Sequence, residues 1–120
     1  YHTILHGQRI ALDMLRPRAL AMDIHQAVEE FFNGQGFRTS KTKSGQQGFF
    51  HGLGHGIGME IHEAPRLNAT SRERLRAGHV VAIEPGLYYR GLGGVRLEDV
   101  VLVTGNGPRN LTKFEKVLEV

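Results

Sequence analysis

HGLGHGIGMEIHE, residues 51–63, places three histidines among four glycines in a chain that has no cysteine. Imidazole titrates near neutral pH and is a common metal ligand, so this density of histidines indicates a functional site. The glycines disfavour a helix and let the backbone approach a neighbouring strand or a ligand closely. The pattern therefore predicts extended, irregular backbone and excludes a helical His-Glu-x-x-His zinc motif. Any further ligands are expected from elsewhere in the chain.

Before this stretch, the sequence predicts two helices. Apolar residues at helical spacing predict a first helix within residues 1–16, ended by Pro17. A second helix is expected to begin at an Asp23 N-cap and to stop at Gly34. Residues 38–48 are polar and contain glycine, which is typical of a surface loop.

After the loop, the period changes from helical to strand-like. Residues 49–62 indicate strand, bend and strand, and a helical turn is expected around Leu75. Two β-branched runs, residues 79–86 and 94–104, predict strands joined by the glycine-rich LYYRGLGG. Apolar residues of the tail are expected to pack on this sheet: Leu111, Phe114 and Leu118. The predicted fold class is α+β, with two N-terminal helices followed by a mostly antiparallel, curved sheet.

Composition narrows the functional classes. Lys and Arg number 15 against 12 Asp and Glu, a net charge of +3 that lacks the concentrated positive surface of a nucleic-acid-binding protein. No apolar run has the length of a transmembrane helix. We therefore expect neither a nucleic-acid nor a membrane partner. The absence of cysteine is typical of a cytoplasmic protein and means that any metal is held by histidine and carboxylate.

Two glutamates stand where the late strands are expected to bury apolar residues. Glu84 follows the run VVAI, and Glu98 lies between Leu97 and the run VVLV. A carboxylate buried alone is costly, so each must be paired, protonated or bound to a cation. Arg96 lies on the same face of a regular strand as Glu98, so a structural salt bridge is one interpretation. A hairpin-like connection would bring both carboxylates together, and a divalent cation between them is an equal alternative.

The histidines divide into two groups. Glycine spacing is expected to expose His51, His55 and His62 along one bend, which favours a functional role for them. The remaining four are expected to be ordinary core or surface residues: His2, His6, His25 and His79.

Three blocks in order, GLGHGIGMEIHEAP, VAIEPG and GVRLEDVVLVT, resemble the pita-bread metallopeptidases, which include methionine aminopeptidase, aminopeptidase P and prolidase. The forms RLED and HEAPRL are more similar to the Xaa-Pro-cleaving branch. The resemblance covers essentially the whole chain and implies half of a pita-bread fold. Two aspartate ligands of the family precede the matched blocks and have no counterpart here. Residues 1–120 are therefore expected to be the C-terminal portion of the catalytic domain.

The resemblance implies a role for each matched residue. His55, Glu84 and Glu98 match metal ligands, with Glu84 also acting as general base and Glu98 bridging two metals. The complete family site holds two divalent ions (Mn, Co or Zn), whereas this chain is expected to bind at most one, weakly. His51, His62 and Arg96 match residues on the substrate side of the family's site. Two of them, His51 and His62, also match catalytic residues that help stabilise the intermediate and shuttle protons.

The implied activity of the parent protein is hydrolysis of the peptide bond before proline, by a dinuclear Xaa-Pro aminopeptidase or dipeptidase. The substrate is a peptide with proline at its second position. The chain alone is expected to be inactive, because the two aspartates are missing, and an exposed sheet edge or apolar face favours a homodimer. The alternatives are a non-catalytic pita-bread module that binds protein partners, and a methionine aminopeptidase-like specificity.

Overall fold

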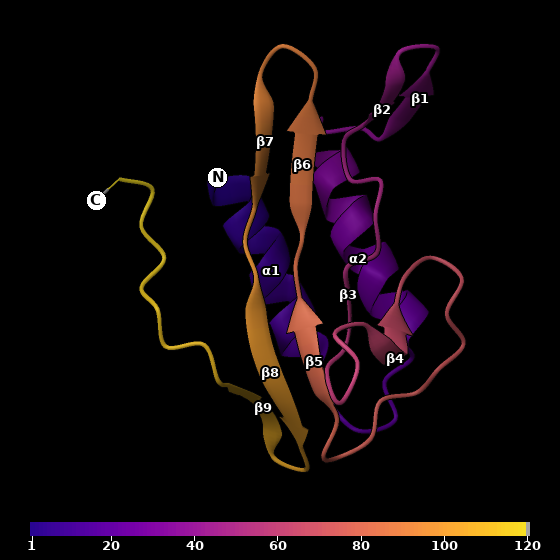
Figure 1. Cartoon of the computed structure of the whole chain (residues 1–120), viewed down its shortest axis with the longest axis vertical. Coiled ribbons are helices and arrows are strands. Elements are labelled where there is room, and N and C mark those ends of the chain that lie inside the picture. The colour runs from indigo at the N-terminus through magenta and orange to yellow at the C-terminus, as the bar shows by residue number, and fades with distance from the viewer. Residues whose placement is uncertain (120) are drawn as a thin grey trace.

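The computed structural model describes residues 1–119 and places two helices before a series of antiparallel strands (Figure 1). Helix α1 spans His2–Met14 and helix α2 spans Ala21–Gly34. The strands are β1 (Ser40–Thr42), β2 (Gly45–Gln47), β3 (Gly54–Gly56), β4 (Glu63–Leu67), β5 (Val80–Ile83), β6 (Gly86–Tyr89), β7 (Gly93–Arg96), β8 (Asp99–Thr104) and β9 (Gly107–Asn110). The expected order of two helices followed by an antiparallel sheet is confirmed.

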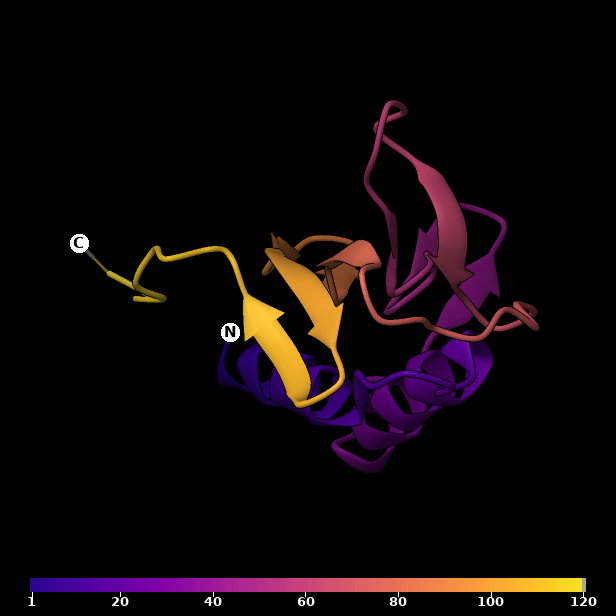
Figure 2. The ribbon, with the colours of Figure 1, turned by 90° about the horizontal axis from the view of Figure 1, so that it is seen from below.

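The two helices pack on each other and cover one side of the strands (Figure 2). Their contact is close at Gly7, where a Cβ atom would meet the ring of Phe32 at 2.6 Å. Gln8, buried on α1, donates from Nε2 to the carbonyl oxygen of Ile83 at 3.1 Å and so ties the helix to β5. Within residues 1–119, neither helix has the length and apolar character needed to cross a membrane.

The start of α2 differs from the prediction. Its N-cap is Leu20, without a side-chain hydrogen bond, and Asp23 lies in the first turn. The first helical N–H instead finds a backbone partner, because Ala21 donates to the carbonyl oxygen of Glu73 at 2.9 Å. Asp23 is still favourable there, since a negative charge in the first turn complements the helix dipole.

The residues that pair with this helix start do not form the expected helical turn. Leu75 is buried, its N–H donates to Ala19 at 2.9 Å, and its carbonyl oxygen accepts from Arg18 at 2.8 Å. These long-range bonds hold residues 73–75 extended. The predicted loop of residues 38–48 is also partly wrong, because β1 and β2 form an antiparallel hairpin within it.

The main sheet has five antiparallel strands in the order β4-β3-β5-β8-β9, with β3 between β4 and β5. Each of the two late runs is divided into two strands, so that β6 and β7 form a separate antiparallel pair. Glu84 follows the end of β5 and Glu98 precedes β8, at the two breaks. Both glutamates therefore lie between strands, where their side chains are not forced into the core.

The tail after β9 does not pack on the sheet as expected. Its apolar side chains are exposed, with Phe114 at 86%. Polar contacts hold this segment instead: Thr112 Oγ1 accepts from Val100 N at 2.9 Å, and Lys116 forms an ion pair with Asp99. The segment consequently runs away from the sheet in Figure 1.

Candidate metal centre and substrate pocket

A cavity of about 590 Å³ opens where β3, the end of β5 and the β6–β7 pair meet. Five of the six residues singled out in the sequence line it: His51, His55, His62, Glu84 and Arg96. The sixth, Glu98, places its carboxylate near the side chains of His55 and Glu84. The structure thus brings together residues that lie up to 47 positions apart in the chain (51 to 98).

His55, Glu84 and Glu98 form a compact cluster of potential metal ligands. One ligand atom from each residue lies within 4.8 Å of the others, and His55 Nε2 is 3.3 Å from Glu84 Oε1. The exposed fraction of the side chain rises from 8% for His55 to 16% for Glu84 and 43% for Glu98. One imidazole and two carboxylates suit a divalent ion of the first transition row. The donor set therefore fits a metal that approaches from the open side of the pocket.

Glycines place His55 on β3, between β4 and β5, and not on the exposed bend that the sequence predicted. A Cβ on Gly54 would overlap the carbonyl oxygen of Ala82, and one on Gly56 would overlap that of Ala64. Only glycine lets β3 fit between its neighbours at these positions. The ligand histidine is consequently buried and fixed by both adjoining strands.

The hydrogen bond at Nδ1 determines which nitrogen of His55 is available. Nδ1 lies 3.0 Å from the carbonyl oxygen of Gly56, which can only accept, so Nδ1 carries the proton. In the neutral imidazole, the lone pair of Nε2 then points toward Glu84. Two electron-rich atoms at this distance are stabilised by a proton or a metal ion between them.

Arg96 lies against both carboxylates. Its Nε is 3.7 Å from Glu84 Oε2 and 3.8 Å from Glu98 Oε2, and its side chain is 51% exposed. The salt bridge considered in the sequence is therefore present together with the ligand cluster. Because the guanidinium is half-exposed, its net contribution to stability is small, and it neutralises charge without closing the site.

His51 is held by Tyr88, which also lines the pocket. Its Nδ1 donates to the carbonyl oxygen of Gly52 at 2.7 Å, so Nε2 accepts from Tyr88 Oη at 3.1 Å. Tyr88 was missed in the sequence, where LYYRGLGG was treated as a connection. The signal was present, because residues 86–89 continue the strand pattern after the break at Pro85.

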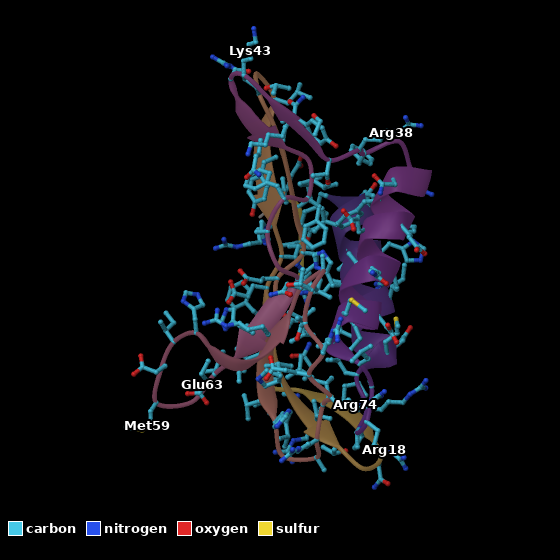
Figure 3. All side chains as sticks on the ribbon, turned by 90° about the vertical axis from the view of Figure 1, so that its right-hand side faces the viewer. Arg18, Arg38, Lys43, Met59, Glu63 and Arg74 are labelled. Atoms are coloured by element: carbon cyan, nitrogen blue, oxygen red, sulfur yellow. The ribbon has the colours of Figure 1, made fainter. Side chains whose placement is uncertain are left out.

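His62 stands at the rim of the pocket. Its ring meets that of His55 edge-to-face with centroids 4.4 Å apart, and the side chain is exposed. His62 is the last residue before β4, which begins at Glu63. The loop that leads to it projects away from the sheet, with the fully exposed Met59 at its tip (Figure 3). A basic side chain is therefore placed next to the ligand cluster with access from solvent.

A buried carboxylate next to Glu98 was also missed. Asp99 is fully buried, and its Oδ2 accepts from Asn110 at 2.7 Å and pairs with Lys116. The alternation of inward and outward residues along β8 was the available signal, because it puts Asp99 on the same buried face as Val101 and Val103. This carboxylate lies outside the cluster formed by its neighbour Glu98.

Residues 1–105 match metallopeptidase family M24, and the chain belongs to this family. It is 39% identical over 118 residues to the Xaa-Pro dipeptidase of Pyrococcus furiosus, covering 98% of this chain and 32% of that protein. Identity to the Xaa-Pro dipeptidase of Pyrococcus horikoshii is 36%, with 98% and 31% covered. The chain thus spans about a third of the length of the curated relatives it matches.

Solved structures agree with this assignment. The prolidase from Pyrococcus furiosus superposes with a TM-score of 0.86, covering 97% of this chain and 32% of that one at 39% identity. An X-Pro aminopeptidase from Thermotoga maritima gives 0.85 at 28% identity, covering 97% and 31%. A methionine aminopeptidase from Rickettsia prowazekii, at 17% identity and 0.69, shares the fold, with 91% and 49% covered. The resemblance to pita-bread metallopeptidases and the partial pita-bread fold are confirmed.

Proposed function

We propose that residues 1–120 form the C-terminal portion of the catalytic domain of an Xaa-Pro aminopeptidase or dipeptidase. The observation that supports this most strongly is the group His55, Glu84 and Glu98, with ligand atoms within 4.8 Å of one another in a pocket also lined by His51 and His62. Relatives named Xaa-Pro dipeptidase match nearly the whole chain. The substrate of the parent protein is a peptide with proline at the second position.

The proposed ligands are His55, Glu84 and Glu98, and the metal is Mn, Co or Zn. Divalent ions held by these residues would supply Lewis-acid chemistry, lowering the pKa of a water molecule and polarising a carbonyl group. Within this chain, Glu84 is the proposed acceptor of a proton from a nucleophile at the cluster; one of its oxygens lies near His55 and the other lies beside the half-exposed guanidinium of Arg96.

We assign a separate role in binding or catalysis to each basic side chain around the cluster. His62, exposed at the rim, donates toward the carbonyl oxygen and the departing amine. His51, held by Tyr88, orients the bound peptide in the pocket. Arg96 keeps the carboxylates close and contributes positive charge on the substrate side.

The chain by itself is proposed to bind a single divalent ion weakly and not to hydrolyse peptides. Its three aspartates do not join the cluster: Asp13 and Asp23 lie on the helices, and Asp99 pairs with Lys116. One imidazole and two carboxylates leave a divalent ion with open positions. The proposal includes a cytoplasmic homodimer, in keeping with the cysteine-free composition and with exposed apolar side chains such as Leu92.

Cobalt titration, followed by visible absorption, tests the ligand set. His55→Ala and Glu84→Gln are each expected to weaken Co²⁺ binding by about tenfold or more, since each removes a ligand. Glu30→Gln, an exposed glutamate on α2, is the matched control and is expected to bind as the unaltered chain does. Unchanged affinity in both ligand variants would contradict the proposed metal site.

The activity is tested on the parent protein with Xaa-Pro dipeptides and matched dipeptides without proline, in the presence and absence of Mn²⁺. Metal-dependent hydrolysis of the Xaa-Pro peptides alone is the expected result. If no Xaa-Pro peptide is cleaved while the metal site is intact, the non-catalytic binding module becomes the better description. Removal of an N-terminal methionine instead would favour the methionine aminopeptidase-like alternative.

A further inference from the structure

His25 is a polar residue on the otherwise apolar buried face of α2. The other buried residues of this helix are Ala21, Ile24, Val28 and Phe32, and His25 itself is 5% exposed. A buried imidazole among aliphatic side chains requires a hydrogen-bond partner to offset its desolvation. The partner of His25 lies on the segment that carries the candidate metal ligand.

That partner is the backbone of Leu53, two residues before His55. Leu53 N–H donates to His25 Nδ1 at 3.2 Å, in a buried hydrogen bond between residues 28 positions apart. The carbonyl oxygen of Leu53 accepts from the N–H of Glu84 at 2.8 Å. Leu53 is therefore held on one side by His25 and on the other by the backbone of a second candidate ligand.

The ring of His25 also supports the start of the same segment. It stacks on Phe49 with centroids 5.0 Å apart and an interplanar angle of 30°. Phe49 in turn meets the ring of His51 edge-to-face, at 5.3 Å and 79°. One imidazole thus contacts both ends of residues 49–53, the stretch that leads into β3 and includes His51.

We propose that His25 is a positioning residue for the metal pocket: by accepting the Leu53 N–H, it fixes the backbone that joins His51, His55 and Glu84. The acceptor role requires the tautomer with the proton on Nε2. Burial, with a smaller contribution from His51, lowers the pKa of His25 to about 4, so the neutral form is present at neutral pH. The link to metal binding rests on the function proposed above, whereas the link to Leu53 does not.

Two substitutions separate the acceptor from the ring. His25→Phe keeps a stacking ring and removes the acceptor, whereas His25→Asn keeps an acceptor near the position of Nδ1 and removes most of the ring. His79→Phe is the matched control, because His79 Nδ1 also accepts a backbone N–H, that of Arg76 at 3.3 Å, but in an exposed hydrogen bond outside the pocket.

The first readout is hydrogen exchange of the Leu53 amide, measured by NMR relative to the amides of β8, which report global unfolding. In His25→Phe, the Leu53 amide is expected to exchange about tenfold faster than this reference allows, since a buried N–H loses its partner. His25→Asn is expected to stay within about twofold of the unaltered chain, as is His79→Phe. Leu53 exchange that is unchanged in His25→Phe, or equally fast in His25→Asn, would overturn the proposal.

The second readout is Co²⁺ affinity. His25→Phe is expected to weaken it by about threefold to tenfold, and His25→Asn to restore it, because ligand geometry depends on the anchored backbone. Equal Co²⁺ affinity in the unaltered chain and His25→Phe would overturn the link to the pocket. If Glu84→Gln also leaves Co²⁺ binding unchanged, the metal site itself fails, while Leu53 exchange still decides whether His25 positions this segment.

Discussion

Lowering the pH from 8 to 5 is expected to destabilise the fold through one imidazole, that of His25. Desolvation by burial, with a smaller contribution from the charge of His51, lowers its pKa from 6.5 to about 4. Between these two values, the unfolded chain binds a proton at this position that the folded chain does not bind. The stability contributed by neutral His25 is therefore complete above pH 6.5 and is lost as the pH falls toward 4.

The size of the effect follows from the two pKa values. A pKa difference of one corresponds to about 1.4 kcal/mol, so this histidine alone lowers the free energy of unfolding by about 2 kcal/mol at pH 5 and by about 3 kcal/mol below pH 4. Small domains have a total stability of about 5–15 kcal/mol, so a loss of this size is readily measured.

Urea unfolding followed by circular dichroism at several pH values, for the unaltered chain and for His25→Phe, measures this contribution. Phenylalanine does not titrate, and the carboxylates that also protonate in acid are common to both proteins. The difference in unfolding free energy between the two is expected to shift by about 2 kcal/mol between pH 8 and pH 5, in favour of the variant. Two parallel stability curves over this range would refute the reasoning.

Two further predictions use the same urea assay at pH 7. Gly54→Ala is expected to lower the free energy of unfolding by about 3 kcal/mol, because its Cβ would overlap the carbonyl oxygen of Ala82. Gly105→Ala, with open space around it, is expected to lower it by less than about 0.5 kcal/mol. Equal losses of stability in the two variants would show that β3 can move aside. Lys116→Met is expected to lower the free energy of unfolding by about 3 kcal/mol, because it leaves the fully buried Asp99 carboxylate without its cation. Lys116→Arg is expected to retain most of the stability. If Lys116→Met leaves the stability unchanged, Asn110 alone satisfies the carboxylate.

The local pattern of the chain was sufficient to predict the helices and to single out the histidines and the two glutamates, whereas the choice of His55 as a candidate ligand came from the family resemblance. The spacing of apolar residues in α2 gave its buried face, and two glutamates after β-branched runs indicated a carboxylate pair. Each of these signals is contained in a short stretch of neighbouring residues, so it can be recognised without knowing what packs nearby. Glu84 and Glu98 converge because the β6–β7 pair between them returns the chain on itself.

The features that were predicted wrongly depend on partners distant in the sequence. Asp23 has good N-cap chemistry, but the pairing of Leu20 with Arg74 supplies a backbone acceptor for the first turn and moves the helix start. The same pairing keeps the segment around Leu75 extended. His25 looked like an ordinary histidine because nothing in its neighbourhood on α2 reveals Leu53 as its partner.

The position of Arg96 beside Glu84 and Glu98 has a consequence for the binding of a cation in the pocket. Its Nε lies at nearly equal distances from the two carboxylates, 3.7 Å from Glu84 Oε2 and 3.8 Å from Glu98 Oε2. If both carboxylates bind a divalent ion, loading the site would exchange one cation for another, because the positive charge of Arg96 already lies beside them. The half-exposed guanidinium of Arg96 would be the counter-ion that such an exchange displaces.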